Sequence, residues 1–103
     1  MERTLPIVIQ KDKLAEFCQR NHIRKLSLFG SVLRDDFTDQ SDVDFLVEFL
    51  PGSRTTYFDL ARMERELSEL LQGRKIDLRT PAELSRYFRQ EVLDTALVQY
   101  EQD

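Results

Sequence analysis

The sequence is poor in the residues that build disulfide or multi-ligand metal frameworks. Its 103 residues contain one cysteine, Cys18, and one histidine, His22. A single cysteine excludes an internal disulfide and a multi-cysteine metal site, and it is typical of a protein kept in a reducing compartment. We therefore expect a cytoplasmic protein.

Long hydrophobic runs and an excess of positive charge are also missing. No segment approaches the roughly 18 apolar residues of a membrane helix, and the start MERTLPIVIQKDK has too short an apolar run for a signal peptide. Nineteen acidic and fifteen basic residues give a net charge of −4, so the chain as a whole does not attract a phosphate backbone. We expect neither a membrane protein nor a protein that binds duplex nucleic acid.

The residues that are present suit one small folded domain. Hydrophobic residues make up 41% of the chain and include seven Phe and three Tyr, which can form a modest core, while 33% are charged. Domains typically have about 100–150 residues, so the chain is too short for two independent cores. We expect a single domain over residues 1–103.

Hydrophobic periodicity divides the chain into alternating helices and strands. The predicted elements are a helix at 11–20, a strand at 23–29, a helical turn at 31–34, a strand at 42–49, a helix at 58–71, a strand at 75–79 and a last helix from 81 to 97. This order predicts an α/β (α+β) fold with a short mixed sheet flanked by helices. We find no internal repeat and no linker.

The two later helices are predicted from apolar stripes. Phe58 begins the stripe of the first of them, which we expect to end near Gly73. The sequence TPAE at residues 80–83 is typical of a capping box with proline at the first helical position, and it predicts the start of the last helix. Tyr87 and Phe88 fall on the stripe of that helix, so we expect them in the core.

Three acidic residues on the predicted strands are the main candidates for chemistry. Side chains alternate along a strand, so Asp42 and Asp44 share one face with their Cα atoms roughly 6.5–7 Å apart, and Asp77 is exposed in the same way on the next strand. Hard carboxylate oxygens suit Mg²⁺, which also takes substrate phosphates as ligands. A pair of such ions would serve a phosphoryl or nucleotidyl transfer.

The turn after the first strand could hold phosphate. Gly30 allows close backbone approach, Ser31 brings a hydroxyl and an N–H to the start of a helical turn, and Arg34 can form paired hydrogen bonds with phosphate oxygens. If the first two strands are antiparallel neighbours, Gly30 lies beside Asp42. The phosphate and metal sites would then meet.

Two runs in this region carry a known signature. They are LFGSVLR at residues 28–34 and SDVDFLV at residues 41–47, and they are followed by KIDL at residues 75–78. Together they resemble the G-S-x-x-R and S-D-x-D motifs, with a third strand acid, of the minimal nucleotidyltransferases in the DNA polymerase beta superfamily. The resemblance covers essentially the whole chain and implies the nucleotidyltransferase fold, similar to the palm of polymerase beta.

The resemblance also implies roles for these residues. Asp42 and Asp44 would bind two Mg²⁺ ions, Asp77 would complete the metal site and help activate the incoming hydroxyl, and Gly30 and Ser31 would hold the triphosphate of ATP with help from Arg34. Many family members have glycine after this arginine. Here Asp35 follows, then another aspartate, and the added negative charge weakens the case for tight nucleotide binding.

The resemblance to small, single-domain members of the family also implies a partner protein. The chain is similar to MntA-type antitoxins, which pair with a HEPN ribonuclease toxin and inactivate it by transferring AMP from ATP to a toxin tyrosine. The alternative is a catalytically inactive antitoxin that neutralises its toxin by binding alone. Transfer to a small molecule such as an aminoglycoside is disfavoured, because so short a chain has no evident acceptor pocket.

Each candidate residue also has a simpler interpretation. A D-x-D pattern alone is more often a solvated sheet face, and the combination with the glycine-serine turn favours a site. His22 is expected at the surface, Cys18 in the core, and Ser31 lacks the G-x-S-x-G context of a hydrolase nucleophile. The basic residues Arg74, Lys75 and Arg79 could balance the acids, touch phosphates or meet a partner, and the sequence does not rank these uses.

Overall fold

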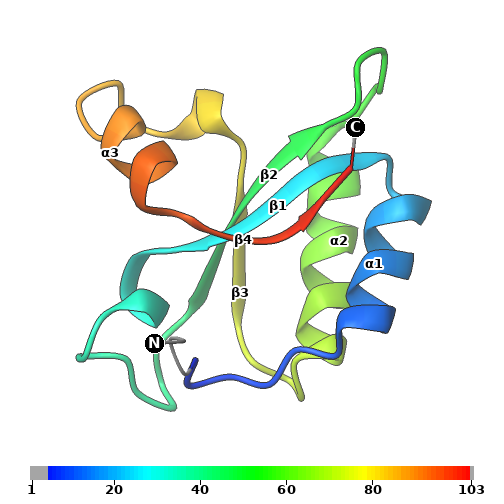
Figure 1. The fold of residues 1–103 in the computed structure, drawn as a ribbon. Helices are drawn as coiled ribbons and strands as arrows, with labels where there is room; N and C mark the ends of the chain where they lie inside the picture. The colour runs from blue at the N-terminus through cyan, green and yellow to red at the C-terminus, as the bar shows by residue number, and fades with distance from the viewer. Residues whose placement is uncertain (1–4, 103) are drawn as a thin grey trace.

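The computed structural model describes residues 5–102, which fold into one sheet with helices on both sides (Figure 1). In chain order the elements are α1 (Lys11–Arg20), β1 (Ile23–Phe29), the 3-10 helix η1 (Gly30–Leu33), β2 (Val43–Phe49), α2 (Tyr57–Leu70), β3 (Ile76–Arg79), the 3-10 helix η2 (Pro81–Glu83), α3 (Arg89–Thr95) and β4 (Leu97–Glu101). The predicted α/β (α+β) class with a short mixed sheet is therefore confirmed.

The sheet has the strand order β3-β2-β1-β4. The strand β1 is antiparallel to both β2 and β4, whereas β2 and β3 are parallel, so the sheet is mixed. The parallel pair requires a crossover, which α2 supplies between the two strands. This topology sets the two strands that carry the acidic residues side by side at the β3 edge.

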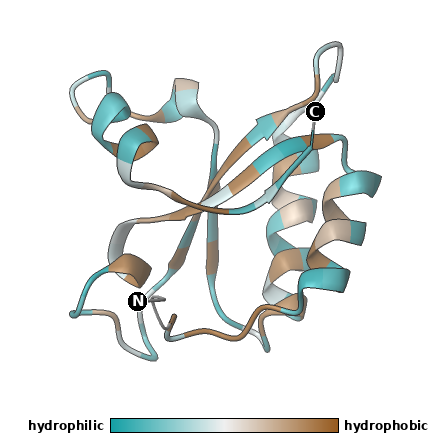
Figure 2. Cartoon of the chain, in the orientation of Figure 1, coloured by the Kyte–Doolittle hydropathy of each residue, from teal (hydrophilic) through white to brown (hydrophobic). Residues whose placement is uncertain are grey.

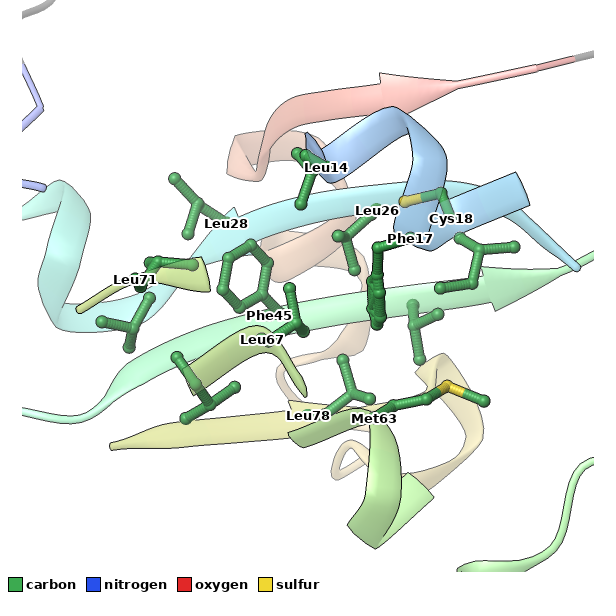
Figure 3. Close-up of a cluster of buried hydrophobic side chains, with 14 of the residues drawn as sticks. Leu14, Phe17, Cys18, Leu26, Leu28, Phe45, Met63, Leu67, Leu71 and Leu78 are labelled. Carbon is green, nitrogen blue, oxygen red and sulfur yellow. The ribbon is translucent and has the colours of Figure 1, made fainter. Parts of the chain in front are cut away.

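The core lies between the sheet and the helices α1 and α2, which occupy one side of it (Figure 1). Phe17 from α1, Phe45 from β2 and Leu67 from α2 are fully buried and point into this layer (Figure 3). Burial of each such side chain is worth about 1.5–3 kcal/mol. Hydrophobic stretches accordingly concentrate in the central strands and in these two helices, whereas most loops are hydrophilic (Figure 2).

The first half of the chain folds as its periodicity predicts. The first helix and first strand have the predicted bounds, and β2 begins one residue later than predicted, at Val43. The predicted helical turn after β1 is the 3-10 helix η1, in which Val32 is buried. In β2, Val43, Phe45 and Val47 are buried in the core, which leaves Asp44 on the face opposite the two covering helices.

The C-terminal third differs from the predicted single helix. The capping box at Thr80 is present, with both the backbone N–H and the hydroxyl of Thr80 donating to the Glu83 carboxylate, but it opens only the short η2. The chain then turns, forms the seven-residue α3 and ends in β4, which pairs with β1. The helical spacing of apolar residues was misleading here because β1 offers an open edge, and pairing with it satisfies the backbone of β4.

Several aromatic side chains expected in the core lie on the surface. Tyr87 is 78% exposed and Phe88 is 61% exposed, in the segment between η2 and α3. Phe58, expected on the buried stripe of α2, is 88% exposed, and Met63, Leu67 and the flanking Leu71 provide the buried contacts instead. The prediction for Phe58 was wrong because other residues of α2 pack on the sheet, and those for Tyr87 and Phe88 were wrong because the predicted continuous helix does not form.

Within residues 5–102 no helix is both long enough and apolar enough to cross a bilayer. The prediction about the N-terminal stretch falls partly on residues 1–4, which lie outside the described residues.

Candidate active site

Three acidic side chains occur on the face of the sheet opposite α1 and α2. Asp44 on β2 and Asp77 on β3 are direct partners in the parallel register, and Asp42 precedes Asp44 by two residues. The intervening residues Val43 and Phe45 are buried in the core. Because side chains alternate along a strand, Asp44 and Asp77 must project to the other face, as predicted.

Electrostatics confirm that these carboxylates are close enough to influence one another. The pKa of Asp44 is raised from 3.8 to about 6, first by its burial and then by the negative charges of Asp77 and Asp42. The positive charges of Arg79 and Arg34 oppose this increase. The cluster therefore carries an electrostatic cost that a bound cation would relieve.

Gly30 brings the turn after β1 against this cluster. Its φ of +77° lies in the left-handed region, and a Cβ atom built on it would collide with the Asp44 carboxylate, lying 3.3 Å from the Asp44 Cγ. The neighbour is Asp44 rather than the predicted Asp42, because the register pairs Phe29 with Asp44. Only glycine combines this conformation with so close an approach.

The rest of the turn offers groups for an anion. Ser31 is half-buried in η1, and its carbonyl accepts a hydrogen bond from the backbone N–H of Arg34 at 2.9 Å. The Arg34 side chain is 63% exposed and pairs with Asp36 at 3.4 Å. Arg34 is close enough to lower the pKa of Asp44, and its exposure leaves it free to turn toward a ligand. Asp35 is exposed beside it.

The basic residues that the sequence left unassigned have separate contacts. Arg79 lies two residues after Asp77 on β3, and its Nε donates to the Asp77 Oδ2 at 3.1 Å. Arg74 instead contacts the loop that leads into β2, through the carbonyls of Thr38 and Ser41. Of the uses that the sequence left open, Arg79 therefore balances an acid, whereas no sequence pattern predicts the long-range contacts of Arg74.

The three acids have the oxygen ligands that Mg²⁺ prefers, but they do not form a complete set of metal ligands by themselves. Among residues 5–102 no three His, Cys, Asp or Glu side chains are gathered tightly enough to hold a metal ion by themselves. Mg²⁺ usually binds through one or two carboxylates and fills its remaining positions with water and substrate phosphates. Asp44 together with Asp42 or Asp77 fits that requirement, and the raised pKa of Asp44 marks the excess negative charge that a cation would balance.

The other candidate residues take no part in this site. Cys18 is fully buried in the core, as expected, and burial raises its pKa to about 12, which keeps the thiol protonated. His22 is exposed just after α1, as predicted. A cavity of about 560 Å³ lies elsewhere, between the start of α2 and η2, and none of the three acids lines it. Its lining residues are Thr55, Thr56, Tyr57, Leu60, Thr80, Ala82 and Glu83.

Comparison with known proteins agrees with this arrangement. The sequence profile described as "Nucleotidyltransferase domain" matches residues 11–98. A Methanocaldococcus jannaschii protein named "Putative protein adenylyltransferase MJ0435" is 31% identical over 87 residues, which are 84% of this chain and 90% of that protein. Residues 11–98, which the profile matches, include both motif regions and all three acids.

Solved structures share the fold. A structure described as a "putative minimal nucleotidyltransferase" is 32% identical, with a TM-score of 0.69 over 84% of this chain and 86% of the other. A structure of a tri-AMPylated Shewanella oneidensis HEPN toxin in complex with an MNT antitoxin matches with a TM-score of 0.62 and 17% identity, over 89% of this chain and 70% of the matched chain. At that identity the second likeness concerns the fold alone.

Proposed function

The chain belongs to the nucleotidyltransferase domain family, and from this premise we propose that it transfers AMP from ATP to a tyrosine of a partner protein. The partner is a HEPN-type ribonuclease toxin, and the chain is its antitoxin. The observation that carries the proposal is the group of mutually repelling carboxylates at Asp42, Asp44 and Asp77, packed against a glycine turn suited to phosphate.

Asp42 and Asp44 are the proposed Mg²⁺ ligands, with Asp77 completing the set. When bound, two Mg²⁺ ions would neutralise the phosphate charge that develops during transfer. Gly30 leaves room for the triphosphate beside Asp44, and the backbone N–H of Ser31, in the first turn of η1, would serve as a hydrogen-bond donor to it. Arg34, whose side chain is exposed, would contact phosphate oxygens.

The proposed reaction is an in-line displacement at the α-phosphorus of ATP. The tyrosine oxygen forms a bond to the α-phosphorus, the bond from that phosphorus to the oxygen bridging to the β-phosphate breaks, and pyrophosphate leaves. Asp77 accepts the proton of the hydroxyl, and Arg79, hydrogen-bonded to Asp77, holds that carboxylate in its orientation. The chain orients both reactants and needs no covalent intermediate.

Several observations support a protein acceptor. The relative from Methanocaldococcus is named as a protein adenylyltransferase, and a structure of the same fold is described as an MNT antitoxin with an AMPylated HEPN toxin. The carboxylates lie on a sheet face rather than in the cavity at α2, so a second macromolecule can approach them directly. The free, buried Cys18 fits the cytoplasm as the place of action.

The proposal is tested by labelling the partner. The chain is incubated with its HEPN-type partner, Mg²⁺ and ATP radiolabelled at the α-phosphate, and label is expected on a partner tyrosine. Replacing Asp42 and Asp44 together by Asn removes two anionic ligands and should abolish labelling. Labelling by the double variant at the wild-type rate would show that these acids do not carry the reaction.

A second candidate function is neutralisation by binding alone. It is favoured by the hydrogen bond that occupies Asp77 and by the lack, within the described part of the chain, of a three-ligand metal cluster. An antitoxin of this kind would work without ATP and only at parity with its toxin. The double Asp→Asn variant should then still neutralise the toxin, whereas under the proposed function it should fail.

A further inference from the structure

Arg74 makes an unusual set of long-range contacts at the entrance to the acidic strands. It lies between the end of α2 and the start of β3, and its Nη2 donates to the carbonyl of Thr38 at 3.0 Å and to that of Ser41 at 3.1 Å. Both carbonyls belong to the loop immediately before Asp42. One guanidinium nitrogen therefore bridges two points of the loop that delivers this acid to the site.

Further contacts fix the plane of the guanidinium. It stacks on the Phe37 ring with its central carbon 4.6 Å from the ring centroid, and the side chain is only 20% exposed. Its ion pair with Asp39, at 3.7 Å, is a weak contact because Asp39 is fully exposed. The Nε atom is buried without a hydrogen-bond partner, so the stacking and the two carbonyls hold the group.

The backbone at Arg74 and Lys75 forms hydrogen bonds with α2 and with the start of β2. The Arg74 carbonyl accepts a hydrogen bond from the Ser68 hydroxyl of α2 at 2.7 Å, and the next residue, Lys75, accepts one from the backbone N–H of Val43 at 2.8 Å. From there β3 runs directly to Asp77, which is paired in register with Asp44. Arg74 thus joins the loop before Asp42 to the strand that carries Asp77.

We propose that Arg74 is a positioning residue that holds the loop before Asp42 against β3, so that the carboxylates of the two strands meet in the geometry that binds Mg²⁺ and ATP. This inference rests on the proposed nucleotidyl transfer. Lysine cannot replace arginine in the role, because an ammonium group cannot stack on Phe37 and bridge both carbonyls in one plane. Arg79, whose contact is with Asp77 itself, does not share this function.

The test compares Arg74→Lys with a matched control, Arg62→Lys. Arg62 on α2 also makes hydrogen bonds, to Asn21 at 3.1 Å and Glu66 at 3.0 Å, but these lie away from the acids. At a temperature where all variants are folded, Arg74→Lys should lower kcat/KM for AMP transfer about 10- to 100-fold and raise the Mg²⁺ concentration needed for half-maximal rate. Arg62→Lys should leave both unchanged.

Two further measurements separate positioning from general stabilisation. Guanidinium at millimolar concentration should partly restore transfer by Arg74→Ala, and it should not affect the Asp42→Asn variant. Hydrogen exchange of the amides at 38–43 should be faster in Arg74→Lys, with exchange in the core of α2 unchanged. The inference is overturned if Arg74→Lys keeps both the wild-type rate of AMP transfer and the wild-type rate of amide exchange at 38–43. It is also overturned if the loss of activity only follows a loss of global stability.

Failure of the proposed function gives a different result. If the wild-type chain transfers no AMP to its partner, the reaction is wrong, and calorimetric binding of Mg²⁺-ATP then decides the role of Arg74. Weaker binding by Arg74→Lys but not by Arg62→Lys supports positioning of the site. Equal binding by both variants contradicts it.

Discussion

Asp44 occupies the most constrained position among the acids. It is half-buried, it faces Gly30 across the strand end, and its burial, followed by the negative charges of Asp77 and Asp42, raises its pKa to about 6. For an acid whose folded pKa exceeds its ordinary value of 3.8, ionisation disfavours the folded state. This residue therefore reduces stability as pH rises from about 4 to above 6, which indicates a group kept for binding rather than for folding.

Replacing Asp44 by Asn should consequently stabilise the free protein at neutral pH. Removing one charge from the cluster should add about 1 kcal/mol after solvent screening, which corresponds to an increase in Tm of about 4–8 °C at pH 7.5. The gain should shrink toward zero near pH 4, where the native carboxyl is protonated. Thermal melts of both proteins across this pH range measure the effect, and a gain that persists at pH 4 would contradict the assigned cause.

A second prediction for a single residue concerns Gly30. Gly30→Ala adds a methyl group against the Asp44 carboxylate, and we expect AMP transfer to fall at least 10-fold. Gly52→Ala and Gly73→Ala are matched controls, because both glycines also have positive φ, +85° and +82°, but an added Cβ meets nothing within 4 Å. All three should lose about 1–2 kcal/mol of stability from left-handed strain. Equal loss of activity in the three variants would contradict the proposed close approach.

At the scale of elements, hydrophobic periodicity predicted those helices and strands that bury one face against the core. The alternation in β2 and the apolar face of α1 were predicted correctly, because each of these elements buries one face against the same core. In β1 the alternation is interrupted by an irregularity between Ile23 and Lys25, so Ile23 lies in the core together with Leu26 and Leu28. The alternation in β2 and β3 predicted that Asp44 and Asp77 share a face. Their direct pairing, and the place of Gly30 beside Asp44, depend on strand register, which is set by pairing between distant segments.

Local sequence patterns predicted neither the C-terminal strand β4 nor the contacts of Arg74. Leu97 lay at helical spacing from earlier apolar residues, but the free edge of β1 provides hydrogen-bond partners that a sequence window does not contain. Arg74 reaches carbonyls more than 30 positions earlier in the chain. Both are tertiary effects that override local preference.

The start of α2 gives a prediction at the element scale. Thr56 caps this helix by accepting from the Asp59 N–H at 3.3 Å, while the Asp59 carboxylate accepts from the Thr56 N–H at 2.9 Å. Thr56→Ala should lower the free energy of unfolding by about 0.5–2 kcal/mol, measured by urea denaturation. Thr55→Ala, next to the box, is the control and should have the smaller effect. A larger loss of stability in Thr55→Ala than in Thr56→Ala would show that α2 begins at a different residue.

For the whole molecule, the proposed function requires a partner protein. The candidate acids lie on a sheet face, and none of them lines the cavity at the start of α2. Under the proposal, the acceptor is a residue of a second protein that covers this face. Each molecule of this chain should then release its modified partner and act again, as an enzyme does and a masking protein does not.

The most direct measurement is the intact mass of the partner under turnover conditions. A HEPN-type partner in about tenfold excess is incubated with the chain, ATP and Mg²⁺, and the mass of the whole partner population is recorded over time. We expect that nearly all of the partner gains one or more AMP groups, and that the Asp42→Asn, Asp44→Asn double variant adds none. A partner that keeps its original mass while its ribonuclease activity is lost only at equal concentration would contradict this expectation.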